Sequence, residues 1–459
     1  MRFDAAAIAA ATNGDLQGLP EDDRPGAIVT DSRKVGPGDW FLALVGERFD
    51  AHNFLDQVRA SGCAGVVAQR VPPGWDRGFV QVTDTLVALQ DLGRAARARA
   101  TGPVIGITGS AGKTTTRAMT ACAIGALGEV HATVGNLNNH IGVPLSLLAA
   151  TETCAAQVIE MGMNAPGEIA LLQSIAAPGI RLITNVGAAH LEGLGTLEGV
   201  AKAKGELFDG ARPGDTCIVN IDDPRVRALP LPEGVVRVTY GGSPSADYRL
   251  VDAHVDATTL STTLTVRTPQ DTVTAVIPSP GIHLASNATA ALVVAGCLGL
   301  DLADAARRLS DYAPVGMRLR IEHGPLGTRI LNDAYNANPL STRASLDTLA
   351  AIRGARRIAI VGDMLELGIH EAQSHRELLA HAAGLGLDLL AVVGPRYTAA
   401  AAALGLDVLS APDAAALAPA LAPRLHPGDL VLLKGSRGIA VERVLPALNA
   451  ILGPTGPET

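Results

Sequence analysis

The segment VIGITGSAGKTTT, residues 104–116, constrains the fold of this chain more than any other stretch. An apolar run typical of a buried strand leads into a glycine-rich loop, and the loop leads into a helix that starts near Thr114. In this arrangement backbone N–H groups point at phosphate oxygens, and the helix N-terminus favours negative charge. The strict phosphate-loop pattern has glycine where this chain has Ile107, but the flanking strand and helix still predict a phosphate-binding loop.

The residue types of this loop indicate its chemistry. Lys113 is expected to reach the β- and γ-phosphates of a nucleotide, and the Thr114 hydroxyl is expected to bind Mg²⁺. A strand–helix turn of the dinucleotide-binding type is the alternative. Such a turn does not require the run Gly-Lys-Thr-Thr-Thr, so phosphate binding is favoured.

Short apolar runs alternate with helical segments along the whole chain, which is typical of an α/β protein. We predict a small N-terminal α/β domain at 1–100, a central domain with a parallel, doubly wound sheet at 101–313, and a Rossmann-like α/β domain at 314–459. The β-branched runs VVRVTY, TLSTTLTV and TVTAVI, between residues 235 and 278, predict an antiparallel β extension on one edge of the central sheet.

Composition argues against several classes of partner. The formal net charge is −8 and aromatic residues make up 3% of the chain, so a nucleic-acid partner is not expected. The longest apolar run, residues 284–300, contains polar residues and is shorter than the ~20 residues of a membrane span, so we expect a buried helix there. The five cysteines are scattered without a C-x-x-C pair, and we expect them to be reduced. We expect a cytoplasmic protein.

Two further strands of the central domain carry candidate ligands at the carboxyl edge of the sheet, where parallel sheets bind their ligands. The strand in AAQVIEMGMN ends at Glu160, whose carboxylate can hold Mg²⁺ or can cap a neighbouring helix. The strand RLITNV leads into GAAHLEGLG, which places His190 in a glycine-rich loop, as a ligand or as a solvated side chain.

The helix LEGVAKAKGELFDG contains two lysines of unequal interest. Lys202 and Lys204 are two residues apart, so they face different sides of the helix. One of them is solvated, and the periodicity of the sequence does not tell which.

Two polar loops complete the set of candidates. In GNLNNHIGVPLSLL, Asn138 and Asn139 lie beside a further asparagine just after the phosphate-loop helix, which suits a polar ligand better than a turn. In RILNDAYNANPLSTRASLDTL, a strand is followed by polar residues and then by a helix that Pro339 opens. These residue types commonly shape turns, but Tyr335 beside two carboxamides equally suits an adenine and a ribose.

Together these motifs resemble those of the Mur ligases of peptidoglycan synthesis. The matching segments follow the order found in that family and span nearly the whole chain: TDSRKVGPGDWFLALVGERFDAHNF, TGSAGKTTT, NNHIGVPLSLL, EMGMNAPGEI, NVGAAHLEGLG with AKAKGELF, DAYNANPLS, GDMLELG and LLKGSRG. Members of the family carry the shifted loop T-G-x-x-G-K-T, which accounts for Ile107. The resemblance implies a uridine-nucleotide-binding N-terminal domain and a central domain that binds ATP.

The resemblance also implies roles for individual residues. Two Mg²⁺ ions would be bound, one by Thr114 and Glu160 and the second by His190, with Lys204 carbamylated by carbon dioxide to give an anionic ligand. Lys113, His190 and Lys204 would serve catalysis. The ATP-binding residues would be Gly109, Ser110, Ala111, Gly112, Lys113, Thr114, Thr115, Asn287, Arg318, Asp333 and Tyr335. Those on the substrate side would be Ser32, Arg33, Asn138, Asn139, Asn336, Asn338, Ser436 and Arg437.

The activity that the resemblance implies is ATP-dependent amide formation by a monomer. ATP would phosphorylate the terminal carboxylate of a UDP-N-acetylmuramoyl-tripeptide, and the amine of D-alanyl-D-alanine would attack the acyl phosphate, with catalysis by positioning and charge neutralisation. The chain lacks the D-N-P-R tetrapeptide of diaminopimelate-adding relatives, which favours the dipeptide. There are two alternatives: a ligase that adds one amino acid, and a module that hydrolyses ATP to drive a partner. His140 and Ala51 depart from the family, which has an acidic residue and glycine at these positions.

Overall fold

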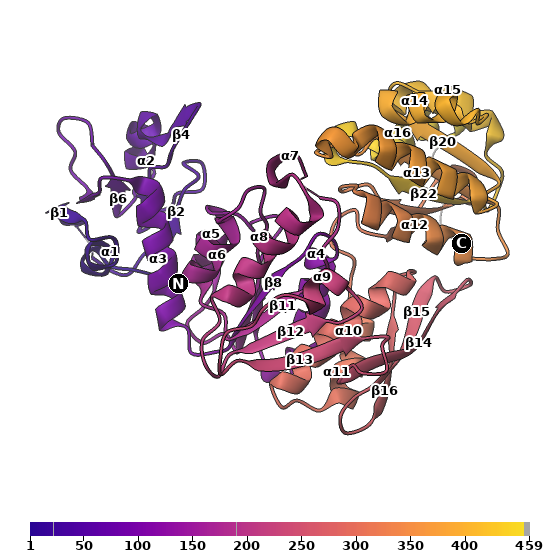
Figure 1. The fold of residues 1–459 in the computed structure, drawn as a ribbon. Coiled ribbons are helices and arrows are strands. Elements are labelled where there is room, and N and C mark those ends of the chain that lie inside the picture. The colour runs from indigo at the N-terminus through magenta and orange to yellow at the C-terminus, as the bar shows by residue number, and fades with distance from the viewer. Residues whose placement is uncertain (22, 190, 454–459) are drawn as a thin grey trace. The chain divides into compact units, whose positions relative to one another are not determined.

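The computed structural model of the chain describes residues 1–21, 23–189 and 191–453. These residues form two compact units, which we describe separately. Unit 1 comprises Met1–Gly106, Leu127–Met163 and Glu168–Ile180, and unit 2 comprises Ile107–Ala126, Asn164–Gly167 and the chain from Arg181 onward. Helices and strands alternate in both units, so the predicted α/β class is confirmed (Figure 1).

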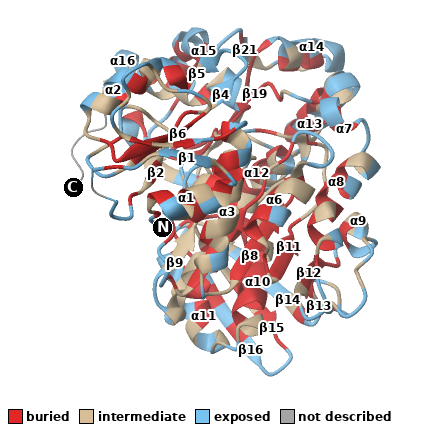
Figure 2. Ribbon diagram, turned by 90° about the vertical axis from the view of Figure 1, so that its left-hand side faces the viewer, coloured by how far each residue is buried: buried red, intermediate tan, exposed pale blue. Residues whose placement is uncertain are grey.

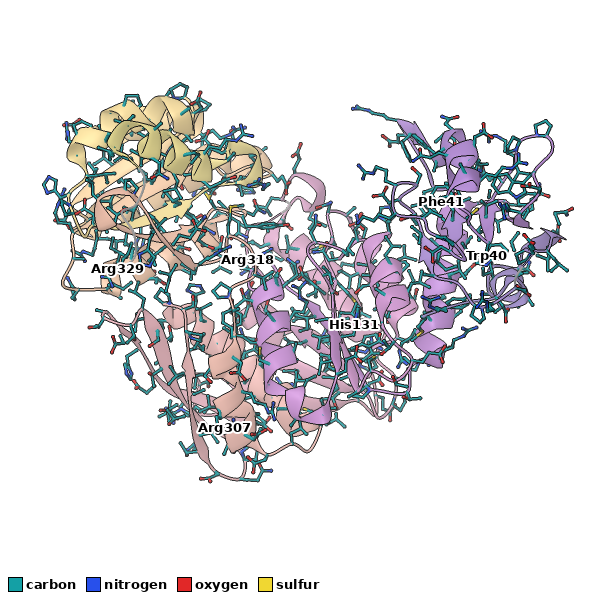
Figure 3. The ribbon with its side chains drawn as sticks, turned by 180° about the vertical axis from the view of Figure 1, so that it is seen from behind. Trp40, Phe41, His131, Arg307, Arg318 and Arg329 are labelled. Atoms are coloured by element: carbon teal, nitrogen blue, oxygen red, sulfur yellow. The ribbon has the colours of Figure 1, made fainter. Side chains whose placement is uncertain are left out.

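The N-terminal part of unit 1 is a five-stranded sheet in the order β1-β7-β6-β3-β2. Only β1 and β7 pair antiparallel. Trp40 and Phe41 are neighbours in β3 and both are fully buried, and neighbouring strand residues point to opposite faces, so the sheet is covered on both sides (Figure 3). The elements are β1 (Asp15–Gly18), β2 (Ile28–Val29), β3 (Trp40–Leu42), β6 (Gly65–Ala68), β7 (Gly78–Gln81), α1 (Ala5–Thr12), α2 (Leu55–Ala60) and α3 (Thr85–Arg99), with β4 (Val45–Gly46) and β5 (Phe49–Asp50) forming a separate hairpin.

The rest of unit 1 surrounds a parallel strand pair. β9 (Val130–Ala132) pairs with β10 (Ala156–Glu160), flanked in sequence by α5 (Gly142–Ala149) and α6 (Glu168–Ala176). β8 (Val104–Thr108), the strand before the phosphate loop, is divided between the units, and all five of its residues are buried. A continuous run of buried residues is typical of a parallel strand covered on both faces.

The central part of unit 2 continues the α/β pattern with an antiparallel extension. Its strands are β11 (Ile180–Ile183), β12 (Thr216–Asn220), β13 (Val236–Gly241), β14 (Tyr248–Asp256), β15 (Ser261–Arg267) and β16 (Thr272–Ile277), and its helices are α4 (Lys113–Ala123), α7 (Leu191–Leu194), α8 (Leu197–Asp209), α9 (Pro224–Arg227), α10 (Ile282–Cys297) and α11 (Leu302–Arg308). β14, β15 and β16 pair antiparallel, which confirms the extension.

The prediction that VVRVTY belongs to this extension is wrong. β13 pairs in parallel with both β12 and β14. The chain returns from β12 to β13 through α9, and a crossover of this kind brings the second strand back in the same direction as the first. The extension therefore starts at β14, a strand that the sequence analysis did not identify.

The apolar segment 284–300 is a buried helix, as predicted. α10 has eleven buried residues, and Figure 2 shows this helix mostly in the colour of buried residues. Within residues 1–21, 23–189 and 191–453, no helix is long and apolar enough to cross a membrane. The five cysteines form no disulfide, also as predicted.

The C-terminal part of unit 2 is a six-stranded sheet in the order β17-β18-β22-β19-β20-β21. Apart from the edge strand β17, its strands are parallel. Asn338 and Ser341 form a capping box at the start of α12, and Pro339 occupies its first turn. The elements are β17 (Arg320–His323), β18 (Arg329–Asp333), β19 (Arg357–Gly362), β20 (Leu389–Val393), β21 (Leu409–Ala411), β22 (Leu430–Lys434), α12 (Pro339–Ala351), α13 (Glu371–Gly384), α14 (Pro395–Leu404), α15 (Ala414–Leu421) and α16 (Val444–Leu452).

Candidate functional site

The phosphate loop of unit 2 depends on two glycines. Gly109 has φ 155° and Gly112 has φ 79°, which L residues rarely adopt. A Cβ atom on Gly109 would lie 1.8 Å from Thr184 Oγ1, and one on Gly112 would lie 2.7 Å from Asn287 Oδ1. Glycine is therefore required at both positions, and the predicted residue Asn287 of α10 lies against the loop.

The loop is held by the segment that follows β11. The Ala111 N–H donates to Asn185 Oδ1 at 2.9 Å, and the Ala111 carbonyl accepts from Thr184 Oγ1 at 2.7 Å and from Asn185 Nδ2 at 3.1 Å. The Ser110 hydroxyl donates to the Gly187 carbonyl at 3.0 Å. The sequence analysis missed Thr184 and Asn185. Their signal is the polar pair that ends the apolar run RLITNV.

The cation and the hydroxyls of the motif meet at the start of α4. Lys113 is the first residue of the helix, and its Nζ donates to the Gly109 carbonyl at 2.7 Å. Thr114 and Thr115 follow in the first turn and are buried. Unit 2 therefore presents glycine backbone, a lysine and hydroxyls at one helix N-terminus, an arrangement that stabilises anions.

The structure distinguishes the two lysines of α8. Lys202 is exposed, whereas Lys204 is 1% exposed. Burial lowers the pKa of the Lys204 ammonium well below its usual value, and the positive charge of Lys113 lowers it further. Lys204 is thus the buried lysine and favours the neutral amine. The other candidate of this region, His190, lies outside the described residues.

In unit 1, Glu160 ends β10 with its side chain buried. Asn138 Nδ2 donates to Glu160 Oε1 at 2.8 Å, so this predicted asparagine orients the carboxylate. Asn139 Oδ1 instead accepts the N–H groups of Ile141 and Gly142, at 3.2 and 2.8 Å. Asn138 therefore binds the Glu160 carboxylate, whereas Asn139 binds backbone N–H groups at the start of α5.

A buried ion pair holds the polar loop that follows β18. Lys434 Nζ lies 2.8 Å from Asp333 Oδ2 and donates to the Asn336 carbonyl at 2.8 Å. The Ser345 hydroxyl donates to Asp333 Oδ2 at 2.6 Å. The sequence analysis did not identify Lys434. It ends the apolar run DLVLLK, which is the same signal that singled out Glu160.

Arg318 and Tyr335, two predicted nucleotide-binding residues, are in contact. The guanidinium carbon of Arg318 lies 3.8 Å from the centroid of the Tyr335 ring, in a cation–π arrangement. Arg318 also donates to the Val315 carbonyl at 3.2 Å. The pair presents a flat cationic and aromatic surface next to the loop of Asp333.

Asn338 connects the two loops of unit 2. Its Oδ1 accepts the Ser341 N–H at 2.8 Å, and its Nδ2 donates to the Ser110 carbonyl at 3.2 Å. The amide that caps α12 thus also binds the phosphate loop. Its neighbour Asn336 is exposed.

The predicted substrate residues of the KGSRG segment differ in exposure. Ser436 is buried, and its hydroxyl accepts the Leu365 N–H at 2.9 Å and donates to the Ala337 carbonyl at 3.3 Å. Arg437 is exposed and lies 2.6 Å from Glu442 Oε1. Ser436 therefore fixes two loops to each other, whereas Arg437 faces solvent.

Ser32 and Arg33 lie in the loop between β2 and β3 of unit 1. Two nitrogens of Arg33 donate to the Asp31 carboxylate, each at 2.8 Å, and this pairing lowers the pKa of Asp31 to about 2. Of the two departures from the family pattern, Ala51 is buried and does not have a positive φ, so its backbone does not need glycine. His140 is half-buried.

The described part of the chain contains no group of three or more His, Cys, Asp and Glu side chains placed to hold a metal ion. The predicted Mg²⁺ ligands are of a different kind: the Thr114 hydroxyl, the Glu160 carboxylate and a lysine that needs modification. Mg²⁺ commonly takes one or two protein oxygens together with water and substrate phosphates. The Thr114 hydroxyl of unit 2 and the Glu160 carboxylate of unit 1 are therefore each of a kind that can bind Mg²⁺ together with a nucleotide.

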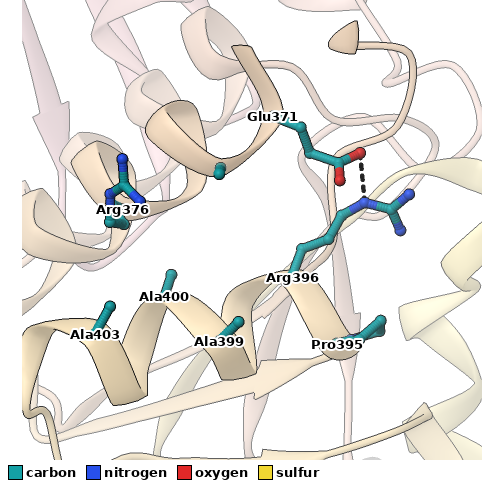
Figure 4. Close-up of a pocket in the computed structure, with 8 residues that line it drawn as sticks. Glu371, Arg376, Pro395, Arg396, Ala399, Ala400 and Ala403 are labelled. Atoms are coloured by element: carbon teal, nitrogen blue, oxygen red, sulfur yellow. Dashed lines mark ion pairs between the residues drawn. The ribbon is translucent and has the colours of Figure 1, made fainter. Parts of the chain in front are cut away.

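A separate pocket of about 280 Å³ lies between α13 and α14 (Figure 4). Alanines of α14 line one side, and Arg396 Nε lies 2.5 Å from Glu371 Oε2 at its edge. None of the predicted site residues is among the eight that line it.

Comparison with known proteins gives consistent matches. Residues 107–295 match the model of the Mur ligase middle domain, and residues 317–437 match that of the Mur ligase glutamate ligase domain. A relative from Synechocystis sp., named UDP-N-acetylmuramoyl-tripeptide–D-alanyl-D-alanine ligase, is 40% identical over 94% of this chain and 94% of its own length.

Two solved structures are also similar over most of the chain. MurF from Acinetobacter baumannii is 32% identical with a TM-score of 0.89, covering 98% of this chain and 99% of that chain. MurF ligase from Thermotoga maritima, solved in complex with ADP, is 30% identical with a TM-score of 0.81, covering 93% of this chain and 98% of that chain.

Proposed function

Because this chain belongs to the Mur ligase family, we propose that it joins D-alanyl-D-alanine to UDP-N-acetylmuramoyl-tripeptide in an ATP-dependent step of peptidoglycan synthesis. The observation that carries this proposal is the 40% identity, over 94% of this chain, to a relative that bears the name of this ligase. The phosphate loop supports the requirement for ATP, since it brings Lys113 and glycine backbone to one helix N-terminus.

The reaction proceeds in two displacements. A terminal carboxylate oxygen of the tripeptide attacks the γ-phosphorus of ATP, so that ADP leaves and an acyl phosphate forms. The amine of D-alanyl-D-alanine then attacks the acyl carbon, the tetrahedral intermediate expels phosphate, and the amine nitrogen loses a proton. The protein supplies no nucleophile and acts by positioning the reactants and neutralising charge.

The residues of the phosphate loop bind the nucleotide in this proposal. The N–H groups of Ser110 and Ala111 are bound by Asn185, so the phosphates are bound by backbone N–H groups at the start of α4, and Lys113 moves from the Gly109 carbonyl to the transferred phosphoryl group. Asn287 lies against the loop and contacts the nucleotide from α10. The stacked Arg318 and Tyr335 face the nucleotide base and ribose, with Asp333 fixed behind them.

Two Mg²⁺ ions complete the charge balance. By the family resemblance, Thr114 and Glu160 would hold one, and His190 with a carbamate on Lys204 would hold the second. When bound, these ions neutralise the phosphate oxygens around the transferred group. The depressed pKa of Lys204 supports its part, because only the neutral amine reacts with carbon dioxide to form a carbamate.

The remaining assignments concern domains and substrates. Residues 1–100, with Ser32 and Arg33, bind the uridine nucleotide, residues 101–313 bind ATP, and residues 314–459 contact the nucleotide and carry the amine side. Asn138, Asn139, Asn336, Asn338, Ser436 and Arg437 shape the substrate site, directly or through the loops that they hold. The chain acts as a monomer in the cytoplasm, where ATP is available.

Substrate profiling tests this function. Purified protein is offered UDP-N-acetylmuramoyl-tripeptide with D-alanyl-D-alanine, and separately UDP-N-acetylmuramoyl-dipeptide with diaminopimelate or lysine. We expect ADP and an amide product only from the first pair. Product only from the second pair would move the chain to another activity of the family.

The same assay distinguishes the ligase from a module that hydrolyses ATP to drive a partner. We expect ADP release to require both the UDP-muramoyl peptide and the free amine. ADP release at the same rate without either substrate would contradict the ligase and favour the module.

A further inference from the structure

Thr133 directly follows β9 and makes the last hydrogen bonds between this strand segment and β10, the strand that ends at Glu160. β9 and β10 pair in parallel from Ala156 to Val158, and the Thr133 N–H still donates to the Val158 carbonyl at 3.1 Å. The next donor along β10 is the Glu160 N–H, which a continued ladder would satisfy with a main-chain carbonyl. It donates instead to Thr133 Oγ1 at 3.0 Å. A side-chain hydroxyl thus takes the place of a strand carbonyl at the residue that bears the carboxylate.

Because main-chain pairing with β10 ends at Thr133, the following residues leave the sheet and form the loop that contains Asn138. After Thr133 the backbone leaves the sheet through exposed residues, with Gly135 at φ 59°. It returns so that the Asn138 carbonyl accepts the Gly162 N–H at 2.8 Å while Asn138 Nδ2 donates to Glu160 Oε1 at 2.8 Å. A Cβ atom on Gly162 would lie 3.0 Å from the Asn138 carboxamide, so the two segments are closely packed.

The Thr133 hydroxyl is itself held from α5. Thr133 and Ser146 are each 2% exposed, and Ser146 Oγ donates to Thr133 Oγ1 at 3.4 Å. His131 Nε2 lies 3.4 Å from Ser146 Oγ on the other side. The backbone of Glu160 is thus tied to α5 through two buried hydroxyls.

We propose that Thr133 is a positioning residue for Glu160, because its hydroxyl fixes the Glu160 backbone where the loop after β9 departs and returns with Asn138. The inference rests on the proposed role of Glu160 as a ligand of Mg²⁺. Thr133 does not touch the metal or the substrates. Thr133 holds the Glu160 backbone, so it fixes the position from which the carboxylate can bind a hard cation. Groups that orient metal ligands are worth about 10- to 100-fold in metal affinity.

The test compares isosteric variants of the full-length chain. Thr133→Val keeps the shape of the side chain and removes the acceptor, whereas Thr133→Ser keeps the acceptor. The readout is the dissociation constant of Mn²⁺ in the presence of ADP, from the electron paramagnetic resonance signal of free Mn²⁺. We expect about tenfold weaker Mn²⁺ binding for Thr133→Val, and Thr133→Ser close to the wild type.

Thr120→Val is the matched control. Thr120 is a buried threonine of α4, and its hydroxyl has no hydrogen-bond partner among the described residues. The same change of side chain there should leave Mn²⁺ binding unchanged. If Thr133→Val does not fold, Ser146→Ala takes its place, since it removes the donor to Thr133 Oγ1 and should weaken Mn²⁺ binding in the same direction.

Glu160→Gln separates this inference from the proposed function. Weaker Mn²⁺ binding in Glu160→Gln together with wild-type binding in folded Thr133→Val would overturn the inference alone. Wild-type binding in Glu160→Gln would overturn the role of Glu160 in metal binding and this inference with it, whereas the ligase activity is decided by substrate profiling. Equal losses in Thr133→Val and Thr133→Ser would also overturn it, because the serine retains the acceptor.

Discussion

The two loops of unit 2 that contain most of the predicted nucleotide-binding residues are held in different ways. The phosphate loop is held through its backbone: Gly109 and Gly112 have no room for a Cβ atom, and the side chains of Thr184 and Asn185 bind the Ala111 amide and carbonyl. The loop after β18 is shaped by side chains, through the buried pair of Asp333 and Lys434.

The difference determines how each loop responds to change. A loop held by its own backbone keeps its shape when an outward-facing side chain is removed, so such a change affects chemistry without affecting the fold. A loop held by a buried ion pair loses its shape when one partner is removed, because the remaining charge has no compensation. The predictions below test this contrast, from the largest expected effect to the smallest.

Removal of Lys434 should disturb the fold of the second loop. Lys434→Met leaves Asp333 buried beside an apolar side chain, and the loss of one partner of a buried pair costs about 3 kcal/mol or more. We expect faster hydrogen exchange of the amides in β18 and β22, measured by mass spectrometry. The double variant Lys434→Met with Asp333→Leu should recover part of the protection. Wild-type exchange in the single variant would mean that the pair does not hold the loop.

Removal of Lys113 should affect chemistry alone. Lys113→Ala takes away the cation at the phosphate loop, and such electrostatic groups are worth on the order of 10²-fold or more in rate. We expect the loss in kcat, with wild-type hydrogen exchange in β8 and α4. Near-normal turnover would contradict the assignment of the phosphate loop.

The lysines of α8 give an internal comparison of a buried and an exposed side chain. Lys204→Ala should lower kcat on the order of 10²-fold, because the carbamate that would hold an Mg²⁺ ion is lost and a bound metal ion supplies several kcal/mol of charge stabilisation. Short carboxylates added to the assay should restore part of the activity, since they supply the missing anion. Lys202→Ala is the matched control and should behave as the wild type, because Lys202 is exposed. Inactive Lys202→Ala with active Lys204→Ala would reverse the assignment.

His283 offers the smallest and most specific effect. Burial lowers the pKa of this α10 histidine to about 4, with Asp333 opposing the shift and Lys434 adding to it. The fold therefore favours neutral His283, and the unfolded chain takes up the proton first as the pH falls below the ordinary histidine value of about 6.5. Stability is lost between these two values.

The corresponding measurement is the stability of His283→Gln at two pH values. The wild type should lose on the order of 1 kcal/mol more than the variant between pH 7 and pH 5, measured by hydrogen exchange of the α10 amides. The same pH dependence in both proteins would show that His283 is not the group responsible.

The sequence predicts the backbone-held site better than the side-chain-held one. Gly109, Gly112 and Lys113 lie within five residues, and the positive φ of each glycine is set locally, so the motif is visible in one stretch. The partner of Asp333 is Lys434, about a hundred residues later, and only the parallel register of β18 and β22 brings the two together. Lys204 could not be separated from Lys202 by periodicity, because the distinction depends on what packs against α8.

The same reason accounts for the errors in the fold. β8, β10, β11 and β18 were predicted from apolar runs, but the direction of β13 depends on the crossover through α9 and not on its own residues. Thr133 was missed because a threonine at a strand end carries no signal until its partner, the Glu160 N–H, is known.

The most direct test of the proposed ligase follows an oxygen atom. UDP-N-acetylmuramoyl-tripeptide with ¹⁸O in both oxygens of its terminal carboxylate is incubated with the protein, ATP and D-alanyl-D-alanine, and the released phosphate is analysed by mass spectrometry. If the carboxylate attacks ATP, one carboxylate oxygen leaves with the phosphate, and each amide formed yields one phosphate with a single ¹⁸O. Phosphate without ¹⁸O would mean that water cleaves ATP, and it would contradict an acyl-phosphate ligase.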